Sequence, residues 1–230
     1  MPQRAAANGQ LIKHFRKLLR ITQEELAAQS DLSIRVIAKA EAGGTLDHET
    51  LEAIAAAFCE QGYAVMLADL AADPGALAMR FLRNYAHYHA ECVTHSRHII
   101  SPDIVAFIDG DPATNPIAGY YHGIEEFDQL WRKFFTLFIR DGGTIPDATP
   151  IVVGNDVIAW GHEHIRIPEV PPQPPGFVMV KMTFANGLMV RFEDYYESTG
   201  MVRALKEWAE EYPDAEWNKL IHGDAMRPLQ

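Results

Sequence analysis

The sequence predicts an α+β protein in two parts, an all-helical N-terminal domain followed by a domain with helices and a curved antiparallel sheet. Up to Phe58, apolar residues recur at helical spacing, whereas strand-like alternation begins at Asp103. Between the two patterns, Asp73-Pro74-Gly75 is typical of a turn at a domain boundary. We therefore expect a first domain at 1–70, a linker at 71–75, a second domain at 76–212 and a tail at 213–230.

Composition is that of a globular protein, and 230 residues leave room for two domains. The chain is 48% hydrophobic and 22% charged, which argues against disorder. It has no run of about 18 apolar residues and its start lacks a secretory signal, so we expect a cytoplasmic protein that does not contact membranes. Cys59 and Cys92 suggest neither a disulfide framework nor a metal-binding pair, and we expect no cofactor and no metal.

Charge is unevenly distributed along this acidic chain, whose formal net charge is −11. Residues 1–39 contain seven Lys or Arg and three acidic residues, a balance of +4, whereas 40–72 and 73–230 have balances of −6 and −9. Exposed charges are largely screened beyond about 10 Å at ordinary salt, so a nucleic acid meets the local balance. The acidic remainder therefore permits DNA binding but should weaken its non-specific part.

Four helices are predicted in the first domain. They are Gly9–Leu19, a helix that begins after Thr22, Ile34–Ala42 and Asp47–Phe58. Glu25 follows Thr22 by three residues, which is the pattern of a capping box. After a turn at residues 30–32, Ser33 is the N-cap of the third helix, which ends before Gly43.

The stretch "TQEELAAQSDLSIRVIAKAE", Thr22–Glu41, resembles the Cro/repressor-type helix-turn-helix family, often called the XRE family. With the flanking helices the resemblance extends over about residues 9–60. Asp31 stands where the family has a turn glycine, and Asp tolerates left-handed backbone better than most residues. Ser30 and Ala40 also replace larger apolar residues of the family, which thins the small core.

The resemblance implies that the third helix enters the major groove of double-stranded DNA. The DNA-contacting residues that it implies here are Gln23, Ser33, Ile34, Arg35 and Lys39. Arg35 is the candidate for a bidentate guanine contact, Ile34 offers a thymine methyl an apolar contact, and Gln23 and Ser33 lie at helix N-termini that bind phosphates. The alternative is a helical bundle that has lost DNA binding or uses the motif for dimerisation.

The second domain is predicted to contain a helix, a strand, a second helix and then a meander of strands. The predicted elements are a helix from Ala76 to about Ser96, a strand at Asp103–Asp109, a helix at Gly123–Phe138, strands at Ile151–Ile167, Phe177–Phe184 and Leu188–Glu197, and a helix at Met201–Glu211. A Gly-Asn turn interrupts the second strand, and Ala185-Asn186-Gly187 forms a hairpin turn between the last two.

This order resembles the NTF2-like superfamily, and more narrowly its SnoaL-like and ketosteroid-isomerase-like domains. The resemblance covers about residues 75–210 and is closest at the G-x-x-x-F start of the helix after the first strand and at "NGLMVRFEDYYE", residues 186–197. It implies a sheet curled into a cone with a deep, mostly apolar pocket. The family uses this fold for enzymes, for binding and for dimer assembly, so the fold alone does not choose a function.

Candidate pocket residues come from both helices and two strands. They are Tyr85, Tyr88, Phe127, Trp131, His162, His164, Glu193 and Tyr195. If the domain is an enzyme, the residues to carry acid-base chemistry are Asp109, His162 and Glu193. The second acid of the ketosteroid-isomerase branch is absent, since the matching stretch reads Met-Val-Lys, and the Asp109 turn is alternatively an acidic surface turn. His162 and His164 share a strand face and are alternatively the start of a metal site.

The sequence therefore predicts a transcriptional regulator that binds an operator as a homodimer and whose second domain binds a small apolar or aromatic ligand. Two alternatives remain open. One is a SnoaL-like isomerase, cyclase or hydratase with an appended DNA-binding domain. The other is a dimer scaffold whose cone is filled by its own side chains.

Overall fold

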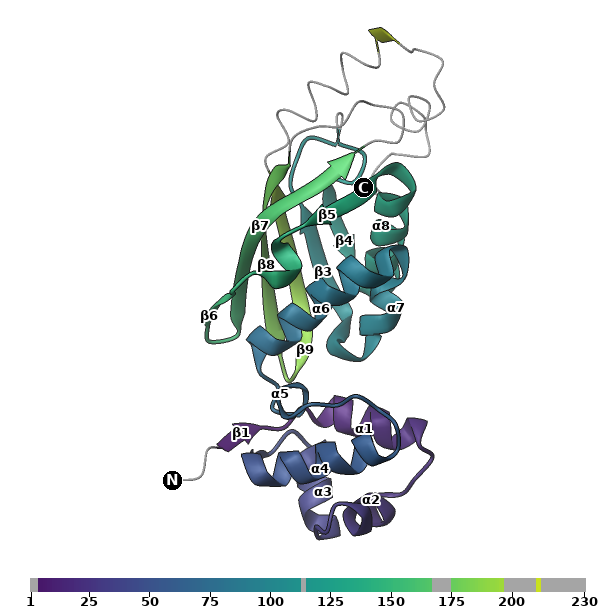
Figure 1. Ribbon diagram of the computed structural model, residues 1–230, viewed down its shortest axis with the longest axis vertical. Helices are drawn as coiled ribbons and strands as arrows, with labels where there is room; N and C mark the ends of the chain where they lie inside the picture. The colour runs from purple at the N-terminus through teal and green to yellow at the C-terminus, as the bar shows by residue number, and fades with distance from the viewer. Residues whose placement is uncertain (1–3, 113–114, 167–174, 197–209, 212–230) are drawn as a thin grey trace.

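The computed structural model describes residues 4–112, 115–166, 175–196 and 210–211. It has the predicted α+β composition, with a helical N-terminal domain and a second domain in which helices pack on a curved sheet (Figure 1). Each domain has its own hydrophobic core. The first core includes residues from Ala7 to Leu70 and the second includes residues from Leu77 to Phe192, with no residue in common.

The helical domain forms as the apolar spacing predicts. Its elements are β1 (Arg4–Ala6), α1 (Gly9–Leu18), α2 (Gln23–Gln29), α3 (Ile34–Glu41), β2 (Thr45–Asp47), α4 (His48–Glu60) and α5 (Leu67–Leu70). The capping box is present, because Thr22 Oγ1 accepts from Glu25 N at 3.1 Å and Glu25 Oε2 accepts from Thr22 N at 2.7 Å. Asp31 has the left-handed φ of 54° that the turn before α3 requires. The two-stranded pairing of β1 with β2 was not predicted.

The second domain is built on a seven-stranded sheet with two longer helices, α6 (Pro74–Tyr88) and α8 (Gly123–Leu137). The strands are β3 (Ile100–Ile108), β4 (Gly119–His122), β5 (Ile139–Gly143), β6 (Ile151–Val153), β7 (Asp156–Arg166), β8 (Gly176–Ala185) and β9 (Leu188–Tyr196). Their order is β4-β3-β9-β8-β7-β5, with β6 also paired to β7. The prediction of an antiparallel sheet is wrong for one pair, because β3 and β9 run parallel.

Three further differences concern single elements. The long helix predicted from Ala76 to Ser96 is broken, because His89 takes a φ of 52° and the chain continues through η1 (His89–Glu91), α7 (Cys92–Ser96) and η2 (Arg97–Ile99). The short strands β4 and β5 were not predicted. The predicted helix Met201–Glu211 lies outside the described residues except for its last two positions.

The helices cover one face of the sheet, which we call the inner face, and leave the other, the outer face, uncovered among the described residues (Figure 1). Strand alternation determines what each face presents. On β7, Val157 and Ala159 are buried on the inner face, whereas Trp160 and His162 are exposed. The curve of the sheet and the helices α6 and α8 enclose the space in which the candidate ligand cavity lies.

The two domains meet at the end of the sheet where the hairpin turn between β8 and β9 lies (Figure 1). Asn186 and Gly187 have φ of 52° and 75°, as the predicted turn requires, and Asn8 Nδ2 donates to Gly187 O at 3.4 Å. A Cβ at Gly187 would lie 2.7 Å from the Asn8 side chain, so this contact admits no larger residue. Arg80 Nη1 on α6 also pairs with Asp69 Oδ1 on α5 at 2.6 Å.

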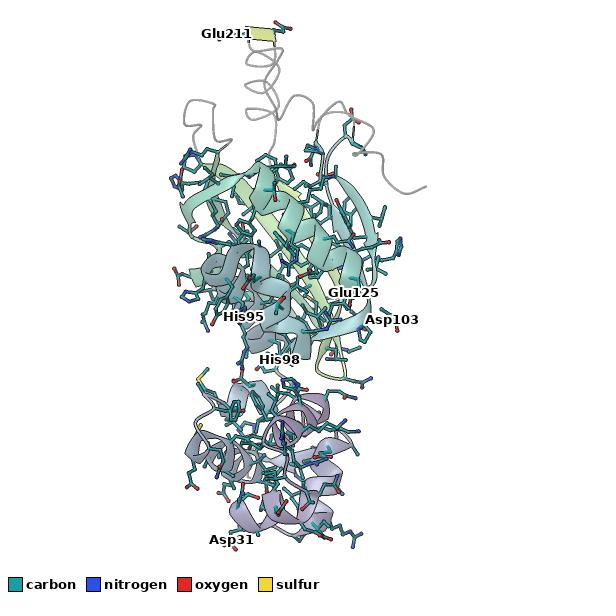
Figure 2. All side chains as sticks on the ribbon, turned by 90° about the vertical axis from the view of Figure 1, so that its right-hand side faces the viewer. Asp31, His95, His98, Asp103, Glu125 and Glu211 are labelled. Atoms are coloured by element: carbon teal, nitrogen blue, oxygen red, sulfur yellow. The ribbon has the colours of Figure 1, made fainter. Side chains whose placement is uncertain are left out.

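His98 lies at the same junction (Figure 2). Its ring stacks on His14 of α1, with ring centroids 5.5 Å apart. Burial, together with the nearby Arg80 and His14, lowers the pKa of His98 to about 4, so the imidazole is neutral near pH 7. Segments of both domains, among them α1, α5, α6 and η2, therefore meet at this junction.

Candidate DNA-reading helix and ligand cavity

Helix α3 presents a polar and basic face to solvent. Ile37 and Ala40 are fully buried in the helical core, which turns the opposite side of the helix outward. The exposed residues of α3 and its N-cap include Ser33, Ile34, Arg35 and Lys39. Arg35 has no ion-pair or hydrogen-bond partner among the described residues, so its guanidinium is free to meet a ligand.

A partly buried ion pair fixes α3 against the two preceding helices. Arg16 Nε on α1 lies 2.5 Å from Glu41 Oε1 at the end of α3, and Arg16 Nη2 donates to Glu41 Oε2 at 3.1 Å. Gln23 Nε2 at the start of α2 donates to the same Oε2 at 2.7 Å. Burial alone would raise the pKa of Glu41, but its bonds to Arg16 and Gln23 hold that pKa below the ordinary value. These contacts fix the orientation of α3 relative to α1 and α2.

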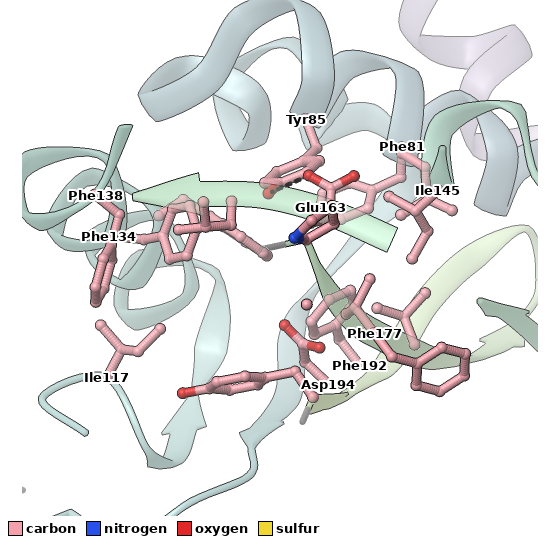
Figure 3. A pocket seen from close by; sticks show the side chains of 18 residues that line it. Phe81, Tyr85, Ile117, Phe134, Phe138, Ile145, Glu163, Phe177, Phe192 and Asp194 are labelled. Carbon is pink, nitrogen blue, oxygen red and sulfur yellow. Dashed lines mark hydrogen bonds between the residues drawn. The ribbon is translucent and has the colours of Figure 1, made fainter. Parts of the chain in front are cut away.

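A cavity of about 130 Å³ lies between the inner face of the sheet and helices α6 and α8 (Figure 3). Most of its wall is aromatic or aliphatic. The lining residues include Phe81, Tyr85, Trp131, Phe134, Phe138, Ile145, Phe192 and Tyr196, with Pro175, Gly176 and Phe177 also contributing. Aromatic packing holds the wall together, as in the pair of Tyr85 and Trp131, whose ring centroids are 5.0 Å apart.

A buried ion pair lies at the cavity wall. Arg140 Nε on β5 lies 2.5 Å from Glu163 Oε2 on β7, and Arg140 Nη2 donates to Glu163 Oε1 at 3.0 Å. The two side chains are 8% and 7% exposed. Tyr85 OH donates to Glu163 Oε2 at 3.4 Å, and Arg140 lies over the Tyr85 ring at 5.4 Å. Glu163 lines the cavity (Figure 3), and its charge is already matched by Arg140, which is not part of the lining.

Asp194 is a second carboxyl group in the cavity (Figure 3), and no cation among the described residues pairs with it. Its Oδ1 is buried and has no hydrogen-bond partner within the described part of the chain. Burial, together with the charges of Glu163 and Asp109, raises the pKa of Asp194 to about 7. Trp131 Nε1, on the same cavity, is also buried and finds no acceptor among these residues. The site therefore offers an unused acceptor and an unused donor in an apolar surrounding.

Comparisons with known proteins give one family match and a set of similar folds. Residues 12–58 match the family model described as Helix-turn-helix, which supports a DNA-binding regulator. No functionally curated protein matches the chain.

Among solved structures, the fold is similar to that of an NTF2-like protein from Burkholderia xenovorans, with 14% identity over 57% of this chain and 94% of that chain, at a TM-score of 0.46. An NTF2-like protein from Burkholderia pseudomallei gives 16% identity over 57% and 95%, at 0.45. A protein with a ketosteroid-isomerase-like fold from Catenulispora acidiphila gives 10% over 54% and 87%, at 0.45.

Only some of the residues that the sequence predicts to line the pocket do so in the structure. Tyr85 and Trp131 line the cavity. Phe127 is not among the lining residues; it packs in the core against Phe81 and Phe192, and these two side chains themselves line the cavity. Tyr88 is exposed and stacks on His95 instead, with ring centroids 3.6 Å apart, because it lies one helical turn beyond Tyr85 where α6 ends.

The expectation for the strands is wrong about which face meets the cavity. His162, His164, Glu193 and Tyr195 lie on the outer face, where Glu193 meets Lys181 Nζ at 3.5 Å and Arg191 Nη2 at 3.0 Å. Although burial opposes it, the two cations hold the pKa of Glu193 below its ordinary value. Asp109 is exposed at the end of β3 and does not line the cavity. The candidate catalytic set of Asp109, His162 and Glu193 therefore does not converge on one site.

Sequence reasoning missed two polar groups of the cavity, Glu163 and Asp194. Each is adjacent in the chain to a residue that was predicted to line the pocket. On β7 the signal was present, because Val157, Ala159 and Gly161 mark the inner face and Glu163 continues their alternation. Among the described residues no group of three or more His, Cys, Asp or Glu side chains is placed to hold a metal ion. Within the same residues no helix is both long and apolar enough to cross a membrane.

Proposed function

We propose that this protein is a homodimeric transcriptional regulator that reads an operator with α3 and responds to a small molecule bound in the cavity of its second domain. The observation that carries the proposal is the exposed row of Ser33, Ile34, Arg35 and Lys39 on a helix that the partly buried pair of Arg16 and Glu41 holds in place. The family match over residues 12–58 supports the DNA-binding part.

The exposed face of α3 has the chemistry of major-groove recognition. A guanidinium such as that of Arg35 pairs bidentately with guanine O6 and N7, which is worth about 1–3 kcal/mol of discrimination. Ile34 suits a thymine methyl group, and Lys39 suits a phosphate or a base edge. Gln23 uses its amide nitrogen on Glu41, which leaves its carbonyl oxygen and the backbone at the start of α2 for DNA.

DNA binding is tested with the full chain and an operator chosen from a random duplex library. Arg35→Ala should weaken binding to the chosen site about 5- to 150-fold, which corresponds to the loss of one bidentate base contact of about 1–3 kcal/mol. Arg83→Ala is the matched control, since Arg83 is an exposed arginine on α6 of the other domain. Enrichment of no sequence, or equal loss in both variants, would remove the proposal of sequence-specific reading.

The outer face of the sheet is the surface that we assign to dimer formation. It exposes Trp160 by 42%, and Met179 lies opposite Trp160 through strand pairing. Phe177, which is 44% exposed and also touches the edge of the cavity, lies two residues before Met179 on β8. Isolated apolar residues on a surface need no explanation, but large ones grouped on one sheet face are typical of interfaces. A two-fold pair of such faces would give two α3 helices for the two halves of a near-palindromic operator.

Sedimentation velocity tests the dimer. Trp160→Asp should convert a dimer into a monomer, because it places a charge in the centre of the apolar group. Ile151→Asp is the control, because Ile151 is 50% exposed but lies on the edge strand β6. A wild-type monomer, or a dimer that survives Trp160→Asp and dissociates with Ile151→Asp, would move the interface elsewhere.

Helix α6 connects the cavity to the reading domain. It contributes Phe81 and Tyr85 to the cavity wall, and Arg80, which directly precedes Phe81 in the same helix, pairs with Asp69 of α5. A ligand that alters the position of α6 therefore acts on the contact between the domains. Arg80→Met should leave ligand binding intact and reduce the ligand's effect on operator affinity; an unchanged effect would exclude this route.

A second candidate function is supported by Asp194. A carboxyl group with a pKa of about 7 in an apolar cavity suits general acid-base chemistry of the isomerase, cyclase or hydratase kind. If the cavity is an active site, Asp194→Asn should abolish turnover of its substrate while Glu193→Gln on the outer face retains it. Equal turnover by both variants would exclude Asp194 as the acid-base group.

A further inference from the structure

The described residues leave one carboxyl oxygen of the cavity without a partner, and a ligand of the right chemical class would bind to it. Asp194 is a carboxyl group with a buried oxygen that has no partner among the residues the structure describes, in a wall that is otherwise mostly apolar. Arg140, the cation next to the cavity, is already held by both oxygens of Glu163. If Asp194 is ionised, Arg140, Glu163 and Asp194 together have a charge of −1.

We propose that the cavity ligand is a small apolar amine, bound as an organic monocation with its ammonium group at Asp194. This inference rests on the proposed function of the cavity as a ligand site and specifies what that site takes. An ammonium group donates a charge-assisted hydrogen bond to the unpartnered oxygen and neutralises the excess carboxylate. A carboxylate ligand would meet a like charge there, and a pure hydrocarbon would leave the oxygen unpaired.

The aromatic wall suits the same class of ligand. Tyr85, Trp131, Phe134, Phe192 and Tyr196 all line the cavity. The face of an aromatic ring attracts an organic cation, most strongly where water is excluded, and aromatic cages are a known means of binding ammonium groups. The free Nε1 of Trp131 adds a donor for an acceptor atom elsewhere in the ligand.

The volume limits the ligand's size. The cavity of about 130 Å³ is close to the roughly 150 Å³ of an engineered apolar cavity that binds benzene. A single ring that bears a short amine is therefore a suitable probe. Benzylamine, benzyl alcohol and benzoate have the same ring and nearly the same size, and they differ in the charge of the group that would meet Asp194.

Calorimetric titration of the full chain with these three probes at pH 8 tests the proposal. Benzylamine should bind at least tenfold more tightly than benzyl alcohol, and benzoate should bind more weakly than either. Asp194→Asn should weaken benzylamine at least tenfold and change benzyl alcohol less than about threefold. Glu193→Gln is the matched control, because this neighbouring carboxylate points to the outer face and should leave all three affinities unchanged within twofold.

The pH dependence provides an independent reading. The titratable groups around Asp194 are Glu163 on β7, Asp109 at the end of β3, Tyr85 on α6 and Tyr196 on β9, and the nearby cation is Arg140. Since the pKa of Asp194 is about 7, a cation should bind about tenfold more weakly at pH 6 than at pH 8. Benzylamine remains protonated over this range, so the change reports on the protein, and it should vanish in Asp194→Asn.

The outcomes separate the two claims. If benzyl alcohol or benzoate binds as tightly as benzylamine, or if Asp194→Asn retains the amine preference, the inference is wrong while the cavity remains a ligand site. If none of the three probes binds, both the inference and the ligand-binding part of the proposed function are overturned. Circular dichroism of Asp194→Asn shows whether the variant is folded, and the retained affinity for benzyl alcohol shows that its cavity is intact.

Discussion

Replacing Arg140 by methionine should destabilise the second domain by about 3–5 kcal/mol, because it removes the partner of a buried carboxylate. Arg140 and Glu163 are each less than 10% exposed and are joined by two hydrogen bonds of 2.5 and 3.0 Å. Each charge-assisted bond is worth about 1.5–3 kcal/mol, and the remaining bond from Tyr85 OH, at 3.4 Å, is too long to replace them. With a urea m-value of about 2 kcal/mol/M, the midpoint should fall by about 1.5–2.5 M.

Tryptophan fluorescence during urea unfolding measures this loss in the right domain, because all four tryptophans lie after residue 130. Arg97→Met is the control: it breaks an exposed pair with Glu125, and such pairs are worth about 1 kcal/mol or less. The double variant Arg140→Met, Glu163→Gln should recover most of the stability, since it leaves no unpaired charge. A loss below about 1 kcal/mol for Arg140→Met alone would refute the reasoning.

The variant should also show a pH signature. Burial raises the pKa of Glu163, and removal of Arg140 raises it further because the opposing cation is gone. A carboxyl group whose folded pKa lies above its unfolded value destabilises the fold when it is ionised, and this penalty disappears as the pH falls through the folded pKa. The stability deficit of Arg140→Met relative to the wild type should therefore shrink between pH 8 and pH 5.

Three further predictions concern the helical domain and the junction. The pKa of His98 in the folded protein is about 4, against 6.5 for an ordinary histidine. The contribution of neutral His98 to the stability of the fold is therefore fully present above pH 6.5 and is lost as the pH falls to 4. Thermal melts should show a pH-dependent loss of at most about 3 kcal/mol that His98→Gln lacks. Arg16→Met should destabilise the helical domain by about 1.5–3 kcal/mol, because Glu41 loses a charged hydrogen-bond partner in a partly buried position; amide hydrogen exchange of α2 and α3 measures the loss. Asp31→Gly should stabilise the helical domain by up to about 1 kcal/mol and so slow the same exchange, because glycine adopts the φ of 54° without strain. Asp31→Val should destabilise the domain and accelerate the exchange.

The helical domain was predictable almost residue by residue because its signals are local. The capping box at Thr22 and Glu25, the N-cap at Ser33 and the tolerance of Asp31 for left-handed backbone each depend on neighbours within a few residues. The partly buried pair of Arg16 and Glu41 was not predicted, because it joins residues 25 positions apart on different helices. Local chemistry thus determines where these helices begin and end, and packing determines which of their polar residues meet.

The sheet was predicted in order but not in detail. Long strands were recognised from alternation and from turns such as Asn186-Gly187, whereas β4 and β5 have four and five residues and too little pattern to detect. The parallel pairing of β3 with β9 joins the first and last strands of the domain, and strand order of this kind is decided by tertiary packing. The break at His89 likewise depends on how α7 folds back on α6, since Tyr88 stacks on His95.

On each of two strands, the residues predicted to line the cavity are one position away from the residue that does. This shift changes which polar groups the cavity presents to a ligand. Alternation says that Glu163 faces away from His162 and that Asp194 faces away from Glu193, but it leaves open which of the two faces is buried. On β9 a bulge opposite Thr183 and Phe184 shifts the alternation, so that Met189 and Phe192 are both buried although three positions apart. A polar strand face with imidazoles suggests a metal or a proton shuttle, whereas the face that lines the cavity has a neutralised Glu163 and an unpartnered Asp194. The ligand class that the cavity favours therefore follows from its burial and not from the most reactive side chains in the sequence.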